Sequence, residues 1–245
     1  MNLIIDQGNT AAKFFLFHKD KIIATKKSNL EENYGNFKKI VKKTLNNEKN
    51  INAIYSSTSN YNQQIVNYLS SNFSKFIIFD RETKIPIKNS YKTPKTLGFD
   101  RLAGIIGANY YFPNQNILSI DAGTAITYDY INDQNEYIGG NISPGLSMRF
   151  RALNYFTEKL PLLEQSGSDK KIGQTTNEAI TLGVENGIFF EINSYITDFK
   201  NSYHDGKIIL TGGDCFFFEK RFKNIIFAKP YLVPVGLNRI LNYNV

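Results

Sequence analysis

The sequence contains little of the chemistry that marks secreted, zinc-binding or membrane-spanning proteins. Cys215 is the single cysteine, which excludes an internal disulfide and makes a zinc cluster implausible. No stretch approaches the ~18 consecutive apolar residues of a membrane helix, and the segment MNLIIDQGNT has no basic stretch followed by a long apolar run. We therefore expect no signal peptide and no membrane association. The sequence predicts a cytoplasmic enzyme or regulator.

The chain carries an excess of positive charge that does not by itself select a partner. The net charge of +7 comes mostly from scattered lysines, which favours a solvated basic surface, with attraction of anionic ligands as the alternative. No zinc finger, helix-turn-helix or aromatic-basic RNA motif accompanies it, so we expect no nucleic-acid partner. A length of 245 residues with 42% hydrophobic residues predicts a globular core, in one domain or two small lobes.

Apolar, β-rich segments alternate with helical patterns along the chain, which predicts a largely parallel α/β sheet. We expect strands at residues 3–5, 14–17, 22–25, 51–57, 75–80, 116–121, 124–131, 136–142, 207–213 and 224–228. We expect helices at 30–45, 62–73, from about 100, at 146–199 with an interruption near 164–173, shortly after 213, and from about 235.

The pattern restarts near the middle of the chain. LIIDQGNTAAKFFLF and LSIDAGTAITYDYI both contain an apolar strand, an aspartate, a glycine, small polar residues and a second strand. The two aspartates, Asp6 and Asp121, are nearly half the chain apart. This recurrence predicts an N-terminal lobe at 1–113 and a C-terminal lobe at 114–245, with the option that the last helix packs back toward the first lobe.

Each repeated turn has the residue types of a phosphate-binding hairpin. A glycine lets the backbone approach an anion closely, and free backbone N–H groups can then point at phosphate oxygens. Thr10 or Thr124 can donate a further hydrogen bond, and Lys13 can reach an oligophosphate as a point charge. The aspartates would act through a cation, since a carboxylate repels phosphate. The simpler alternative is that each Asp-x-Gly forms only a turn.

Three further motifs carry weaker signals. LGFDRLAG contains Asp100 and Arg101, which suit the base and the cation of a kinase, although a capping acid with a surface ion pair is the alternative. The glycines of TGGD at 211–214 allow close approach of an adenosine moiety, or only a tight turn. Ala179, Gly183 and Gly187 repeat at helical spacing and predict close helix packing, in the core or between subunits.

Together these motifs resemble one family, the type III pantothenate kinases of the acetate kinase/sugar kinase/Hsp70/actin superfamily. The resemblance runs in order along nearly the whole chain, through DQGNTAAK, YKTPKTLGFDR, DAGTAITYD, GGNISPG, IGQTTNEAITLG and TGGD. It implies an α/β fold of two ribonuclease-H-like, actin-like ATPase lobes with an ATP cleft between them. It also implies a homodimer that phosphorylates the primary hydroxyl of pantothenate to 4'-phosphopantothenate, the first step of coenzyme A biosynthesis.

The resemblance also assigns roles to residues. Asp100 matches the proposed general base, and Asp121 matches the ligand of a monovalent cation, K⁺ or NH₄⁺; Mg²⁺ would accompany ATP. Thr176 fits a substrate role better than Thr175, because it has the Thr-x-x-Ala spacing to Ala179. The implied ATP-binding residues are Asp6, Gln7, Gly8, Asn9, Thr10, Ala11, Ala12, Lys13 and Thr124. The implied pantothenate-binding residues are Tyr91, Gly98, Phe99, Asp100, Arg101 and Thr176.

Two other functions stay open from sequence alone. One is a kinase of another small hydroxylated substrate, which the LGFDR motif and Tyr91 argue against. The other is an accessory protein of gene regulation that keeps the fold without turnover. Loss of Asp100, Arg101 or Asp121 would favour that role, and all three are present.

Overall fold

The chain divides into two compact units in the computed structural model, which describes residues 1–8, 11–29, 34–45, 50–58, 61–222 and 227–245. The first lobe consists of Met1–Tyr111 together with Leu232–Val245, and the second lobe of Phe112–Tyr231. The last helix of the chain therefore belongs to the first lobe.

The first lobe is built on a five-stranded sheet in the order β3-β2-β1-β4-β5. β1–β2 and β2–β3 are antiparallel pairs, whereas β4 lies parallel to both β1 and β5. The sheet is thus mixed, and the expectation of a largely parallel sheet is wrong for its first three strands, which are joined by turns too short for a crossover. The strands are β1 (Asn2–Gln7), β2 (Ala11–His18), β3 (Lys21–Asn29), β4 (Asn52–Ser57) and β5 (Lys75–Ile78).

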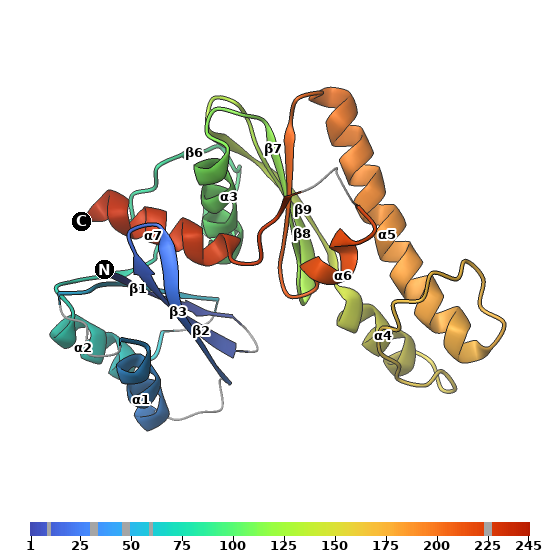
Figure 1. Cartoon of the computed structure of the whole chain (residues 1–245), viewed down its shortest axis with the longest axis horizontal. Coiled ribbons are helices and arrows are strands. Elements are labelled where there is room, and N and C mark those ends of the chain that lie inside the picture. Colours follow the sequence, from blue (N-terminus) through green and yellow to red (C-terminus); the bar gives the residue numbers. More distant parts are fainter. Residues whose placement is uncertain (9–10, 30–33, 46–49, 59–60, 223–226) are drawn as a thin grey trace. The chain divides into compact units, whose positions relative to one another are not determined.

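Helices cover both faces of this sheet, with α1 and α2 on one side and α3 and α7 on the other (Figure 1). The covered faces explain why β1 and β2 read as near-continuous apolar runs. The first-lobe elements besides the sheet are α1 (Tyr34–Leu45), α2 (Gln63–Asn72), β6 (Lys88–Asn89), the 3₁₀ turn η1 (Pro94–Thr96), α3 (Phe99–Tyr111) and α7 (Leu232–Asn244).

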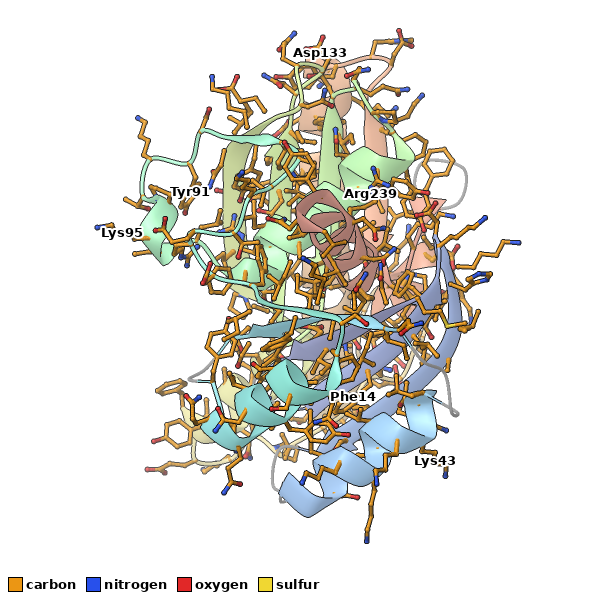
Figure 2. All side chains as sticks on the ribbon, turned by 90° about the vertical axis from the view of Figure 1, so that its left-hand side faces the viewer. Phe14, Lys43, Tyr91, Lys95, Asp133 and Arg239 are labelled. Carbon is orange, nitrogen blue, oxygen red and sulfur yellow. The ribbon has the colours of Figure 1, made fainter. Side chains whose placement is uncertain are left out.

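Alternate residues of the central strands form the core beneath α1 and α2. Leu3 and Ile5 of β1 and Phe14 of β2 are almost fully buried there, and the Phe14 ring lies 5.6 Å from the ring of Phe37 on α1. Figure 2 shows Phe14 between the sheet and the helices, while Lys43 of α1 points outward. The polar, lysine-rich face of α1 is therefore its solvated face, as the periodicity predicts.

The five strands of the second lobe follow the equivalent order, β9-β8-β7-β10-β11. β7–β8 and β8–β9 are antiparallel, and β10 lies parallel to β7 and to β11. The internal repeat predicted from the two aspartate hairpins is therefore confirmed at the level of topology. The strands are β7 (Ile117–Ala122), β8 (Ala125–Ile131), β9 (Glu136–Pro144), β10 (Lys207–Thr211) and β11 (Phe227–Ala228).

Three helices bury the apolar face of this second sheet, namely α4 (Leu146–Tyr155), α5 (Thr176–Ser202) and α6 (Cys215–Glu219). Leu118 and Ile120 of β7 pack in one cluster with Ile188 of α5 and Phe218 of α6. Of the helices in the described part of the chain, none combines the length and apolar character that a bilayer crossing requires.

The α3–α7 contact is the closest helix packing in the first lobe and depends on glycine. A Cβ at Gly107 would lie 2.3 Å from the carbonyl oxygen of Leu232, and one at Gly236 would lie 1.8 Å from that of Ala103. The clashing atoms belong to the backbone of the neighbouring helix and cannot rotate away as a side chain can. Both positions therefore require glycine. These glycines let the chain's last helix dock between α3 and the sheet (Figure 1).

Gly107→Ala should therefore destabilise the protein, since the added methyl group must push α7 away from α3. We expect the free energy of unfolding to fall by about 1–3 kcal/mol, the usual cost of overpacking. Gly104→Ala, one turn earlier in α3, is the control: its Cβ would meet only Val233 Cγ2 at 3.8 Å, so better helix propensity should raise stability by up to ~1 kcal/mol. Urea unfolding of both variants checks this, and equal effects would contradict it.

Candidate active site

The turn between β1 and β2 carries most of the predicted ATP-binding residues of the first lobe. β1 ends at Gln7 and β2 begins at Ala11, and the Gly8 N–H donates to the Ala11 carbonyl at 3.0 Å. Asp6 and Lys13 face each other in register across the two strands, as do Gln7 and Ala12. The structure thus brings these residues together at one end of the sheet, whereas the predicted Asn9 and Thr10 lie outside the described residues.

Asp6 is the most electrostatically perturbed group of this turn. Burial raises its pKa to about 6, the nearby Lys13 ammonium opposes that shift, and the carboxylate of Asp100 adds to it. Asp6 and Asp100 therefore lie close enough for their charges to interact. Two carboxylates from separate predicted motifs share one region of the first lobe.

The end of β4 supports this turn from the neighbouring strand. Tyr55 donates its hydroxyl proton to Gln7 Oε1, and the Thr58 N–H donates to the Gln7 carbonyl at 3.0 Å. Ligands of α/β sheets bind outside the carboxyl ends of the parallel strands, and β1 and β4 both end here. The turn is therefore held at the edge where a binding site is expected.

The LGFDR motif forms the start of α3. Asp100 Oδ1 accepts the N–H of Arg101 at 2.8 Å, and a Cβ on Gly98 would lie only 2.5 Å from the same oxygen. Gly98 thus leaves room for the Asp100 carboxylate. Arg101 is buried, and its guanidinium carbon lies 5.8 Å from the centre of the Tyr91 ring. The structure brings together Tyr91 and Arg101, two of the predicted substrate residues.

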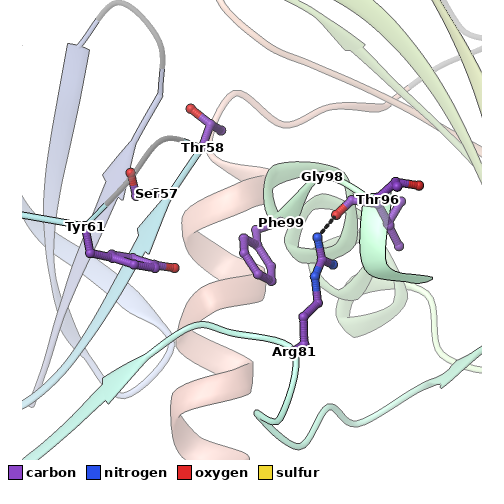
Figure 3. Close-up of a pocket in the computed structure, with 8 residues that line it drawn as sticks. Ser57, Thr58, Tyr61, Arg81, Thr96, Gly98 and Phe99 are labelled. Atoms are coloured by element: carbon purple, nitrogen blue, oxygen red, sulfur yellow. Dashed lines mark hydrogen bonds between the residues drawn. The ribbon is translucent and has the colours of Figure 1, made fainter. Parts of the chain in front are cut away.

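A cavity of about 590 Å³ opens beside this motif within the first lobe (Figure 3). Gly98 and Phe99 form part of its wall, as predicted substrate residues. The sequence analysis missed the remaining lining residues: Ser57, Thr58, Tyr61, Arg81, Thr96 and Leu97. The run of hydroxyl residues after the buried strand β4 was a usable signal, whereas nothing local in the sequence marks Arg81. Figure 2 shows Tyr91 and Lys95 on the loop that leads into α3.

The β7–β8 turn of the second lobe is also closed by a glycine N–H that donates back to an alanine carbonyl, although this turn is one residue shorter than the β1–β2 turn. The Gly123 N–H donates to the Ala125 carbonyl at 3.1 Å, and Asp121 is paired with Thr127 across the hairpin. Thr124 lies within this turn, and its carbonyl accepts the Gly145 N–H at 3.1 Å. The predicted cation ligand Asp121 and ATP contact Thr124 therefore share one hairpin.

The TGGD motif packs directly on this second turn. The Asp214 N–H donates to the Ala122 carbonyl at 2.9 Å. Gly212 has a φ of +94°, and a Cβ there would lie 2.4 Å from Asp121 Oδ1. Glycine at this position thus leaves space around the Asp121 carboxylate, and burial raises the pKa of Asp214 beside it. The TGGD motif forms a tight strand–helix turn, which is one of the two structures expected from its sequence. It borders Asp121, the predicted cation ligand.

The two candidate threonines have different surroundings at the start of α5. Thr175 caps the helix, since its Oγ1 accepts the Glu178 N–H at 3.2 Å. Thr176 is the first helical residue and is exposed. In the part of the chain that the structure describes, no hydrogen bond joins Thr176 to Asp121 or Thr124.

The oxygen atoms at the β7–β8 turn are of the kind that hard cations bind. Asp121 offers a carboxylate beside backbone carbonyls, which K⁺, NH₄⁺ and Mg²⁺ accept. Among the described residues, no group of three or more His, Cys, Asp or Glu side chains could hold a metal ion.

Solved structures confirm the predicted fold class. A Baf family transcriptional activator from Campylobacter jejuni aligns over 99% of this chain and 98% of its own, with a TM-score of 0.62 and 24% identity. A 2-dehydro-3-deoxygalactonokinase from Sinorhizobium meliloti aligns over 100% and 99%, with a TM-score of 0.60 and 10% identity. At these identities the likeness establishes the fold alone, which this chain shares with both proteins.

Other relatives share a much higher sequence identity with this chain. A type III pantothenate kinase from Bacteroides fragilis is 42% identical over 246 aligned positions, covering 100% of this chain and 98% of the relative. One from Cytophaga hutchinsonii is 40% identical, with 100% of both chains covered. The sequence model of the type III pantothenate kinase family matches residues 2–198, which include both aspartate hairpins and the LGFDR motif. This chain belongs to the type III pantothenate kinase family.

Proposed function

We propose that this chain transfers the γ-phosphoryl group of ATP to the primary hydroxyl of pantothenate, giving ADP and 4'-phosphopantothenate, the first step of coenzyme A biosynthesis. The observation that carries the proposal is the position of Asp100. Asp100 comes directly after Gly98 and Phe99 in the chain, two residues that line the cavity, and its charge interacts with Asp6 of the β1–β2 turn. An acceptor site and a phosphate turn thus meet in the first lobe.

Asp100 acts as the general base in this proposal. As the pantothenate hydroxyl oxygen forms its bond to the γ-phosphorus, the bond to the bridging oxygen of ADP breaks, and the hydroxyl proton passes to the Asp100 carboxylate. Asp100 Oδ1 is held by the Arg101 N–H, and within the described residues Oδ2 accepts no protein hydrogen bond. Arg101 and Tyr91 orient the acceptor, and Thr176 contributes a further substrate contact.

The β1–β2 turn binds the phosphates of ATP. Gln7, Gly8, Ala11 and Ala12 border the bound phosphates, and the Lys13 ammonium adds a positive charge. With a pKa of about 6, Asp6 is ionised near pH 7.5 and can bind the Mg²⁺ that accompanies ATP. Asn9 and Thr10 belong to the same proposed loop by sequence.

The second-lobe turn supplies the other phosphate contact, through Thr124, and a monovalent cation site at Asp121. K⁺ or NH₄⁺ held there would offset phosphate charge. The space that Gly212 leaves around the Asp121 carboxylate supports this role. We propose that the two halves, with a boundary near residue 113, each contribute one such turn. A cytoplasmic location fits a chain with one cysteine.

Two alternatives keep the fold but change the function. A kinase of another small alcohol would use the same base with a different acceptor, and an accessory protein of gene regulation would need no turnover. The Baf name of the Campylobacter jejuni protein favours the second only by analogy. The presence of Asp100, Arg101 and Asp121 supports the catalytic role.

We also propose that the protein is a homodimer that joins through its second lobe. Tyr155 and Phe156 at the end of α4 are 82% and 81% exposed, and Phe190 on α5 is 65% exposed. A Cβ added at Gly183 on α5 would have no other atom within 4 Å. At this position the small-residue face of the helix is therefore not packed against the core of its own chain. An exposed apolar surface beside a smooth helix face suits a second copy.

Asp100→Asn should abolish most turnover while leaving the fold intact, because the amide cannot accept the hydroxyl proton. We expect kcat to fall about 10²–10⁴-fold, the usual contribution of general base catalysis. A coupled ADP-release assay with pantothenate measures this, and unchanged release would refute the assignment. Asp133→Asn, in an exposed turn of the second lobe, is the matched control.

Replacing K⁺ by the larger, non-coordinating tetramethylammonium ion should raise the KM for ATP in the wild-type enzyme. In Asp121→Asn the KM should be high in both salts, because the cation ligand has lost its charge. We expect at least a fivefold loss of the K⁺ effect, equivalent to about 1 kcal/mol of binding free energy. An Asp121→Asn variant that still responds to K⁺ as the wild type does would contradict the cation assignment.

Tyr155→Asp combined with Phe156→Asp should shift the protein from dimer to monomer, because two charges would be buried without partners at the contact. Analytical ultracentrifugation at about 10 μM protein measures the mass of the particle in solution. A stable dimer should remain associated at this concentration. Tyr243→Asp changes an aromatic residue of the first lobe that is 57% exposed and should leave the dimer intact. A monomeric wild type would overturn the proposal.

A further inference from the structure

The cavity beside α3 contains a positive charge that the proposed reaction does not yet use. Arg81 lines this cavity together with Gly98 and Phe99, which precede the base Asp100. We propose that Arg81 is a positioning residue that binds the carboxylate end of pantothenate while its primary hydroxyl lies at Asp100. This inference rests on the proposed function and names the end of the substrate that the cavity holds.

The guanidinium of Arg81 is fixed on the cavity wall by two contacts. Its Nη2 donates to the Leu97 carbonyl at 2.6 Å, the bond drawn in Figure 3. Its Cζ lies 4.2 Å from the centre of the Phe99 ring, and that ring packs in turn on Phe79 at 5.0 Å. Stacking on an aromatic face and one carbonyl bond hold the group in place, so little side-chain freedom is lost when an anion binds.

No carboxylate of the described residues forms an ion pair with Arg81. The adjacent Asp80 uses Oδ1 to hold its own turn, accepting the N–H groups of Glu82 and Thr83 at 3.0 Å each and the Thr83 hydroxyl at 2.8 Å. Within the described part of the chain, Arg81 has no acidic partner within 4.0 Å, and Leu97 is the one carbonyl to which it donates. Its remaining N–H groups can therefore bind an anionic oxygen.

The other polar side chains of the cavity are poorer donors for an anion. Tyr61 already donates its hydroxyl proton to the Phe79 carbonyl at 2.7 Å, and Thr96 donates to the Thr93 carbonyl at 3.0 Å. These hydroxyls retain lone pairs, which suit the hydroxyl and amide N–H donors of a substrate. Arg81 is thus the group on this wall best suited to a carboxylate.

The order of residues along the wall fits a substrate with a carboxylate at one end and an alcohol at the other. Arg81 bonds to Leu97, Gly98 and Phe99 follow, and Asp100 comes directly after them. A volume of about 590 Å³ holds a small organic acid. Pantothenate has both end groups, with an amide and a second hydroxyl between them.

The test compares pantothenate with pantothenol, in which an alcohol replaces the carboxylate. For Arg81→Met we expect the KM of pantothenate to rise about tenfold, as for loss of one hydrogen bond to a charged group near solvent, with kcat nearly unchanged. The KM of pantothenol should stay within twofold of the wild type. Arg81→Lys keeps the charge and should recover part of the loss. Arg239→Met removes an arginine stacked on Tyr110 in the same lobe and should change neither KM.

The comparison of two substrates in one variant cancels any general loss of folded enzyme. If Arg81→Met raises both KM values equally, or neither, Arg81 does not bind the carboxylate and the inference is overturned while the proposed function stands. If the wild-type protein phosphorylates neither compound, the proposed function fails and this inference fails with it. A selective rise for pantothenate supports the carboxylate contact.

Discussion

The structure depends most on a backbone hydrogen bond that occurs twice. In each lobe the central strand ends in an acid, and a glycine N–H just beyond it donates back across a short turn, from Gly8 to Ala11 and from Gly123 to Ala125. This bond closes the hairpin and fixes the direction of the next strand. It also keeps the acid at the strand end, at the edge where the parallel strands of the sheet finish.

The consequences of these turns are electrostatic. Asp6 is half-buried and its charge interacts with that of Asp100, and desolvation raises its pKa to about 6, so the first-lobe site holds two interacting carboxylates opposed by Lys13. In the second lobe, Gly212 adopts a positive φ and clears space around Asp121. Cations and phosphates are the ligands that satisfy such an arrangement, which is why phosphoryl transfer fits it better than hydrolysis by a nucleophilic side chain.

Local sequence predicts much of this architecture. Most strands and helices lie close to their expected positions, although residues 156–163, which were expected to be helical, lie outside any helix. The repeated Asp-x-Gly motifs predict two lobes that start with the same hairpin, and both lobes do. The mixed sheet was not predicted, because alternation of strands and helices does not say which strands pair as hairpins. The sequence did contain a signal in the two-residue link Lys19–Asp20, since so short a connection permits only an antiparallel pair.

The residues of the candidate site also differ in how well the sequence predicts them. Residues within one motif, such as Gly98 to Arg101, are placed together by chain connectivity, so their joint role can be inferred from sequence. Arg81 reaches the cavity only because its guanidinium stacks on Phe99 and bonds to Leu97, contacts between residues far apart in the chain. Neighbours of this kind depend on tertiary packing and leave no local pattern.

Identification of the product tests the central claim most directly. Purified wild-type protein with ATP, Mg²⁺, K⁺ and pantothenate should give a phosphomonoester whose ³¹P signal couples to the protons of the primary carbinol, with one ADP formed per ester. ADP formed at the same rate without pantothenate, or a phosphate on any other position of the acceptor, would contradict the account.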